Sequence, residues 1–162
     1  MFETKVIVAV AALCSTVAAE AACWSPRAAA AAQVRELDAM MMVSALRCRF
    51  TDPGLLVRYN AFVVRERSAL LQANAELKAH FSAEVGAAAA LNAFDRFSTQ
   101  LANRYGAGVE GLACGDVTAI VDAATGEGRG FAGLAAIAER AEIRPLLAGG
   151  ACEATEFAAR RP

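Results

Sequence analysis

The chain has little of what metal sites and catalytic centres are built from. Its 162 residues include one histidine, one tryptophan and two tyrosines, and aromatic residues make up 7% of the sequence. His80 has no second histidine or close cysteine pair near it, so the spacing of a metal site is missing. No serine lies in a G-x-S-x-G setting. We therefore predict no metal, no cofactor and no nucleophilic catalytic residue.

The sequence also lacks an excess of either charge. Sixteen basic and 17 acidic residues leave a formal net charge of −1 at neutral pH. A protein that binds phosphate backbones or anionic lipid surfaces usually carries a basic patch or stripe. Nucleic acid is therefore excluded as an expected partner.

Long apolar runs are confined to the N-terminus. Hydrophobic residues make up 57% of the chain, but alanine runs such as 28–32 and 87–90 supply much of this fraction. A membrane-spanning helix needs about 20 continuous apolar residues. Beyond the N-terminus no stretch of that length is free of charge. We expect no transmembrane segment once the N-terminal segment is removed.

The first 22 residues have the pattern of a secretory signal. Lys5 precedes an apolar run over 6–19, and Ala19 and Ala21 flank Glu20 in an A-x-A arrangement. The pattern predicts cleavage after Ala21 or Ala22 and a mature protein in the periplasm or secreted. An uncleaved, alanine-rich first helix remains the alternative. Residues 23–162 are then a normal size for a single helical domain.

Five cysteines are present, and the first, Cys14, lies in the predicted signal. Removing it leaves Cys23, Cys48, Cys114 and Cys152, tens of residues apart. An even number of cysteines in an exported chain favours disulfides over a metal site. We predict two disulfides in the mature protein.

Helical periodicity covers most of the chain, and no segment alternates polar and apolar residues as a strand would. The pattern predicts three long helices over 27–49, 53–81 and 82–105. Asp52 and Ser82 are the expected N-caps of the second and third helices. Two short helices over 116–124 and 131–141 follow, with a further turn after Pro145. The predicted fold is all-α, an antiparallel bundle of three long helices plus two or three short C-terminal helices, stapled by disulfides.

The helix order predicts the disulfide pairing. Short connections force consecutive helices to run antiparallel, so the first and third long helices end on the same side of the bundle. Cys48 ends the first helix and Cys114 follows the third, so these two should pair. Cys23 and Cys152 then pair by elimination.

Two motifs have simpler explanations than ligand binding. The segment 128–133 satisfies G-x-G-x-x-G, but a dinucleotide site needs parallel strands that this sequence does not offer, so a glycine-rich turn between short helices is favoured. Met40, Met41 and Met42 point in different directions around a helix, which favours core packing over copper binding.

Polar residues on the second and third long helices are the remaining candidates for a binding site. Helical bundles place ligand sites between helices. The candidate binding residues are Tyr59, Asn60, Arg96 and Asn103.

The stretch 37–49, together with Tyr59-Asn60-x-Phe62, Asn74-x-x-Leu77-Lys78-x-His80-Phe81 and Phe94-Asp95-Arg96-Phe97, resembles a group of uncharacterised small exported proteins of alphaproteobacteria. The resemblance covers roughly residues 33 to 115. Some members carry an S-adenosylhomocysteine hydrolase label, but this chain has neither the length nor the fold signals of that enzyme. The resemblance implies export and assigns no functional residue.

These observations favour a periplasmic or secreted binding module. Its expected partner is an unknown protein, an envelope component or a small apolar ligand. A small enzyme with a site between the second and third long helices, and a structural envelope component, remain as alternatives.

Overall fold

The computed structural model describes residues 23–109 and 111–152, which form six α-helices and one short 3-10 turn. The predicted signal over 1–22 lies outside the described residues. The helices are α1 (Pro26–Arg47), α2 (Pro53–Arg65), α3 (Arg67–Val85), α4 (Ala87–Tyr105), α5 (Cys114–Gly126) and α6 (Gly130–Arg140), and the turn η1 (Cys48–Phe50) follows α1. The all-α prediction is confirmed, and α1, α3 and α4 are its three long helices.

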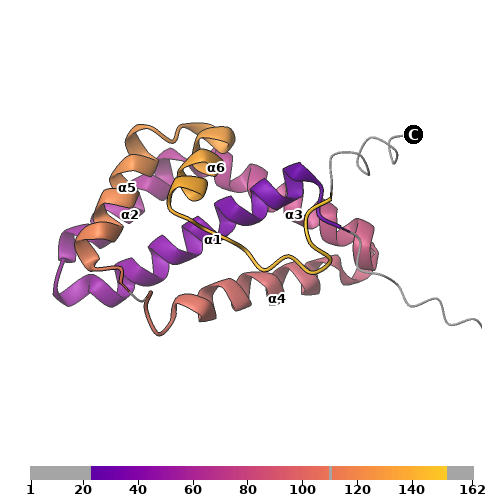
Figure 1. Cartoon of the computed structure of the whole chain (residues 1–162), viewed down its shortest axis with the longest axis horizontal. Coiled ribbons are helices and arrows are strands. Elements are labelled where there is room, and N and C mark those ends of the chain that lie inside the picture. The colour runs from indigo at the N-terminus through magenta and orange to yellow at the C-terminus, as the bar shows by residue number, and fades with distance from the viewer. Residues whose placement is uncertain (1–22, 110, 153–162) are drawn as a thin grey trace, which may run out of the picture.

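The central helix of the bundle is α1. It packs against each of the five other helices, and Figure 1 shows it between α4 and the pair α5 and α6. Its buried residues follow one another along the chain over 36–41 instead of forming a single stripe. Met40 and Met41 are fully buried there, which confirms core packing for the methionine run. Ser25 caps the helix by accepting a hydrogen bond from the Ala28 amide, and Pro26 fits its first turn.

The second predicted helix is two helices, which corrects the predicted range 53–81. Asp52 caps α2 as expected, but the helix ends at Arg65 and α3 begins at Arg67. Glu66 between them is only 5% exposed, and its carboxylate accepts a hydrogen bond of 2.9 Å from the Gly130 amide at the start of α6. A buried carboxylate needs such a partner. Local periodicity cannot reveal a partner that lies 64 residues away.

The boundary between the next two helices is also corrected. Ser82 lies inside α3, which continues to Val85, and α4 begins at Ala87. Gly86 between them has φ +80°, a conformation that only glycine adopts without a steric penalty. The chain therefore reverses at Gly86, and α3 and α4 form an antiparallel hairpin (Figure 1).

Both short C-terminal helices are present, as α5 and α6, and the segment after α6 returns to the start of α1 (Figure 1). Trp24 anchors this return. Its amide donates to the Gly150 carbonyl at 2.8 Å, its carbonyl accepts from the Cys152 amide at 2.8 Å, and its indole donates to Ala148. The Trp24 ring is buried against Phe81 and Phe97. The two ends of the described chain are thereby fixed to the bundle.

The disulfides pair as the helix order predicted. Cys48 bonds to Cys114, and Cys23 bonds to Cys152. The Cys48–Cys114 disulfide joins the end of α1 to the start of α5. The Cys23–Cys152 disulfide joins the residue before Trp24 to the residue whose amide is hydrogen-bonded to the Trp24 carbonyl.

Candidate functional site

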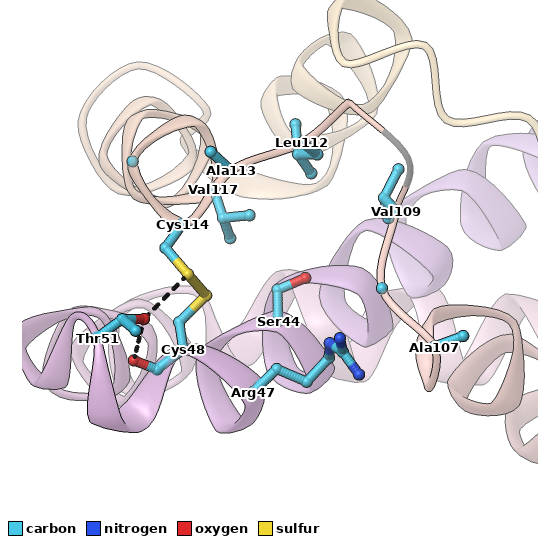
Figure 2. Close-up of a pocket in the computed structure, with 12 residues that line it drawn as sticks. Ser44, Arg47, Cys48, Thr51, Ala107, Val109, Leu112, Ala113, Cys114 and Val117 are labelled. Atoms are coloured by element: carbon cyan, nitrogen blue, oxygen red, sulfur yellow. Dashed lines mark hydrogen bonds between the residues drawn. A yellow bond between two sulfur atoms is a disulfide. The ribbon is translucent and has the colours of Figure 1, made fainter.

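A large cavity of the described structure lies at the end of α1, where the loop from α4 to α5 passes over it. Its volume is about 870 Å³, which is within the range of about 300–1,000 Å³ typical of small-molecule sites. Figure 2 shows the Cys48–Cys114 disulfide at one side and the loop residue Ala107 at the other. The residues that line it are Ser44, Arg47, Cys48, Thr51, Ala107, Gly108, Val109, Leu112, Ala113, Cys114, Gly115 and Val117.

Arg47 holds the loop over the end of α1. Its guanidinium donates a hydrogen bond of 2.6 Å to the Gly106 carbonyl. Gly108 has φ +98°, and a Cβ at this position would lie 3.2 Å from the Arg47 guanidinium. The loop therefore needs glycine at this point, both for its backbone conformation and for its close approach to Arg47.

The walls of the cavity are mainly apolar. Figure 2 shows Val109, Leu112 and Val117 around the space next to the disulfide. Ser44 is almost fully buried, and its hydroxyl contacts the Met40 sulfur at 3.9 Å. The described lining contains no carboxylate and no imidazole. The cavity can therefore bind an apolar group, whereas its described lining offers no general base for chemistry.

Arg47 supplies the positive charge of the cavity. Within the described residues it forms no ion pair with a carboxylate. A guanidinium has several N–H donors in a planar fork that matches a carboxylate or phosphate. Its position suits an anionic group at the edge of an apolar ligand.

The two cysteines of the cavity differ in exposure. Cys48 is 7% exposed, while Cys114 is partly exposed. The Thr51 hydroxyl lies 3.4 Å from the Cys114 sulfur and 3.2 Å from the Cys48 carbonyl. Neither the disulfide sulfur nor the Cys48 carbonyl carries a hydrogen, so the single Thr51 proton is donated to one of these two acceptors at a time.

The four binding residues expected from the sequence are not brought together. Tyr59 is buried on α2, and its hydroxyl donates to Asp38 Oδ1 at 2.9 Å. Asn60 is exposed on α2, and Arg96 and Asn103 are exposed on α4. Arg96 lines a separate cavity of about 220 Å³ beside Trp24, at the middle of α4. The four residues do not form one site.

Two buried carboxylates on α1 were missed by the sequence reasoning. Glu36 accepts hydrogen bonds from the Tyr105 hydroxyl at 2.7 Å and from Arg104. Asp38 accepts from Tyr59 and is paired with Arg35. Both carboxylates lie within the buried run over 36–41. Their sequence signal is the placement of two acidic residues on either side of Leu37, in the middle of an apolar helix.

These contacts shift the ionisation of the groups involved. Burial raises the pKa of Asp38, although Arg35 and the Tyr59 hydrogen bond partly offset that effect. Burial and the neighbouring carboxylates raise the pKa of both Tyr59 and Tyr105 well above the usual value. Both phenols therefore stay protonated at neutral pH and act as hydrogen-bond donors that tie α2 and α4 to α1.

His80 lies at the opposite end of the molecule from the large cavity. Its ring stacks on Trp24 at a centroid distance of 3.8 Å, and its Nε2 lies 3.6 Å from a Glu84 carboxylate oxygen. Burial lowers the pKa of His80, although Glu84 opposes that shift. His80 is therefore a packing residue of the Trp24 cluster.

The described residues, 23–109 and 111–152, also bear on membrane insertion and on metal binding. No helix in this part of the chain is both long and apolar enough to cross a membrane. Nor does it hold a group of three or more histidine, cysteine, aspartate or glutamate side chains arranged to bind a metal ion.

Comparisons with protein-family models, with curated proteins and with solved structures find no match to this chain. The cavity beside the Cys48–Cys114 disulfide is therefore the candidate site on its geometry alone.

Proposed function

We propose that the chain is an exported binding protein of the periplasm or extracellular space, and that its cavity beside the Cys48–Cys114 disulfide takes a small molecule with an apolar body and an anionic group. The observation that carries this proposal is the combination of an apolar cavity of about 870 Å³ with the Arg47 guanidinium at its edge. The ligand expected from the sequence was a small apolar molecule, and the position of Arg47 adds an anionic group to that ligand.

The apolar body is supported by the cavity walls. Val109, Leu112 and Val117 line the space together with the disulfide (Figure 2). Burying apolar surface contributes roughly 25 cal/mol for each Å² removed from water. A medium-length alkyl chain therefore gains affinity from this surface, and small polar molecules do not.

The anionic group is supported by Arg47. Its contact with Gly106 uses one nitrogen, and Arg47 is the charged residue among the described residues that line the cavity. A charge-assisted hydrogen bond contributes about 1.5–3 kcal/mol, with the lower end appropriate for an exposed arginine. Fatty carboxylates and related amphiphiles combine the two required properties.

Export is supported by the signal pattern over 1–22, by the resemblance to exported alphaproteobacterial proteins and by the two disulfides of the described chain. Intact-mass measurement of protein recovered from the cell envelope or medium is expected to show a chain that starts at Ala22 or Cys23. A mature chain that retains Met1 would contradict the proposal of cleaved export.

Ligand binding is tested by displacement of a fluorescent probe. Purified oxidised protein is incubated with anilinonaphthalene sulfonate, which is itself apolar and anionic, and is then titrated with decanoate, decanol or decylamine. Decanoate is expected to displace the probe at the lowest concentration, because it alone offers Arg47 a carboxylate. Equal displacement by decylamine would contradict the role of Arg47.

Matched variants identify the site. Arg47→Ala is expected to weaken decanoate binding by roughly tenfold and decanol binding by much less. The control is Arg49→Ala, because Arg49 is a nearby exposed arginine that stacks on Phe50 and does not line the cavity. Ala107→Trp should abolish binding of both ligands by filling the cavity from the exposed loop. Unchanged decanoate affinity in both cavity variants would place the ligand elsewhere.

A further inference from the structure

We propose that the Cys48–Cys114 disulfide is a thiol–disulfide exchange site, which oxidises a dithiol that enters the large cavity, and that Cys114 is the sulfur that the substrate attacks. The Cys23–Cys152 disulfide is also partly exposed, but the backbone hydrogen bonds of Trp24 hold its two cysteines together, and we assign it a structural role. This inference shares the cavity of the proposed function but does not depend on binding of an amphiphile.

The two sulfurs of this disulfide differ in their access to a thiol from solvent. Both Cys48 and Cys114 line the cavity, so the disulfide is part of its wall (Figure 2). Cys48 is 7% exposed, whereas Cys114 is partly exposed. A thiolate that enters the cavity therefore reaches the Cys114 sulfur, and Cys48 is left as the buried resolving cysteine.

The two cysteines lie at opposite kinds of helix end. Cys114 is the first residue of the 13-residue helix α5, and Cys48 directly follows the last residue of α1. The positive end of a helix dipole stabilises a thiolate, and the negative end disfavours one. In the reduced protein the negative charge therefore belongs on Cys114.

Three charged groups surround this position. Arg47 lines the same cavity from the end of α1, with its guanidinium on the side of Ala107, where it attracts an incoming anionic thiol (Figure 2). The Asp116 carboxylate accepts from the Ala113 amide at 2.8 Å, and the Asp52 carboxylate accepts from the Leu55 amide and the Thr118 hydroxyl. The Asp116 carboxylate is held by a donor of the turn that it caps, and the Asp52 carboxylate is held by its own turn and by Thr118 of α5, which reduces their repulsion of a Cys114 thiolate.

Thr51 adds a donor at the reacting sulfur. Its hydroxyl lies 3.4 Å from Cys114 Sγ. The one proton of this hydroxyl is shared with the Cys48 carbonyl at 3.2 Å, and a Cys114 thiolate draws it to the sulfur because the acceptor then carries a full charge. Thr51 is therefore a positioning residue that stabilises Cys114 as a leaving group.

The exchange has two steps. A substrate thiolate attacks Cys114 Sγ, the bond between Cys114 and Cys48 breaks, and the electron pair goes to Cys48 Sγ, which takes a proton from solvent. The second substrate thiolate then attacks the substrate sulfur of the mixed disulfide and releases Cys114 as a thiolate. The substrate dithiol is oxidised to a disulfide, and the protein disulfide is reduced to two cysteines.

The second disulfide differs in its surroundings. Trp24 follows Cys23, and its backbone is hydrogen-bonded to Gly150 and to Cys152 at 2.8 Å each. These bonds hold Cys23 and Cys152 together even when their sulfurs are reduced, so the disulfide re-forms readily. A crosslink between two segments that stay aligned resists net reduction.

The rate of reduction of the full mature protein tests the proposal. Oxidised protein is treated with dithiothreitol, samples are quenched with iodoacetamide over time, and labelled cysteines are identified by peptide mapping. Cys48 and Cys114 are expected to be labelled at least about tenfold faster than Cys23 and Cys152. Equal rates for the two disulfides, or faster loss of Cys23–Cys152, would overturn the proposal.

Variants test which sulfur is attacked and how the thiol enters. Cys48→Ser is expected to form a stable adduct with oxidised glutathione on Cys114, faster than Cys114→Ser forms one on Cys48. In the wild type the negatively charged thioglycolate should react faster than the positively charged cysteamine when compared at equal thiolate concentration. Arg47→Ala should remove this preference, and Arg49→Ala should keep it. Glutathione adducts that form faster on Cys48 would refute the assignment of Cys114.

Probe displacement separates this proposal from the binding function, since that assay contains no thiol. A protein that binds decanoate but reduces both disulfides at one rate would retain the binding function and lose the exchange site. A protein that does not bind decanoate but reduces Cys48–Cys114 faster than Cys23–Cys152 would retain the exchange site and lose the binding function.

Discussion

The Tyr59 hydroxyl donates a hydrogen bond of 2.9 Å to Oδ1 of Asp38, and this bond joins α2 to α1 in the interior of the molecule. Asp38 is 6% exposed, so its carboxylate depends on Tyr59 and on the ion pair with Arg35 in place of water. Removing a donor from a buried acceptor costs the desolvation of that acceptor as well as the bond.

Tyr59→Phe is therefore expected to lower the free energy of unfolding by about 1–3 kcal/mol. Urea denaturation monitored by circular dichroism measures the change. Asn60→Ala is the control, because Asn60 is the exposed neighbour of Tyr59 and its loss should change stability by less than about 0.5 kcal/mol. Equal effects of the two substitutions would show that the Asp38 contact contributes nothing to stability.

Glu36 accepts hydrogen bonds from Arg104 and Tyr105, so substitutions at Glu36 and Arg104 should have non-additive effects on stability. Arg104→Met leaves the 1% exposed Glu36 carboxylate with only the Tyr105 hydroxyl, so it should destabilise the protein. The Arg104 side chain is 31% exposed, and solvent screening limits the expected cost to about 1–3 kcal/mol. Adding Glu36→Gln removes the unpaired charge. The double variant should therefore be more stable than Arg104→Met alone, whereas simple additivity in urea denaturation would argue against the ion pair.

Gly128 and Gly133 of the G-x-G-x-x-G segment allow close packing of α6 against the end of α5, whereas a Cβ at Gly130 would meet no atom within 4 Å. A Cβ at Gly133 would lie 2.6 Å from the backbone carbon of Gly128, which is too close without a backbone shift. Gly133→Ala should therefore lower the melting temperature and cost about 1–3 kcal/mol, as overpacking does. Gly126→Ala is the matched control, since a Cβ there meets no atom within 4 Å. Full stability of Gly133→Ala would contradict this packing role.

The lowered pKa of His80 predicts a loss of stability in acid. Below pH 6.5, the ordinary value for histidine, the unfolded chain binds more protons at this site than the folded chain does. The contribution of His80 is therefore fully present above that pH and is lost as the pH falls through the lowered folded pKa. Asp38, whose pKa is raised, has the opposite pH dependence, so only a comparison with a variant isolates His80.

His80→Phe keeps an aromatic ring against Trp24 and removes the titration. The unfolding free energy of the wild type, measured in urea at several pH values, should fall more steeply below pH 6.5 than that of the variant. Glu84→Gln is the second comparison. It removes the charge that raises the His80 pKa, so the decline should extend to lower pH. Identical pH profiles for wild type and His80→Phe would show that His80 has the same pKa in the folded and the unfolded chain.

Local sequence patterns were sufficient to predict the fold class, the disulfide pairing and the position of most helix ends. Helical periodicity, the cap Asp52 and the helix-starting Pro53 act over a few residues, so they can be recognised locally. The pairing of Cys48 with Cys114 followed from the length of the connections, because short loops force neighbouring helices to run antiparallel.

Only the tertiary structure decided which polar groups are buried and where the cavity lies. Glu66 divides the second predicted helix because its partner, the Gly130 amide, lies at the start of a distant helix. The cavity lies between Arg47 and the loop that contains Gly106, and these two residues are 59 positions apart in the sequence. Helical periodicity reports which face of one helix is apolar. It carries no information about side chains that meet through the packing of several helices, and the candidate site consists of such side chains.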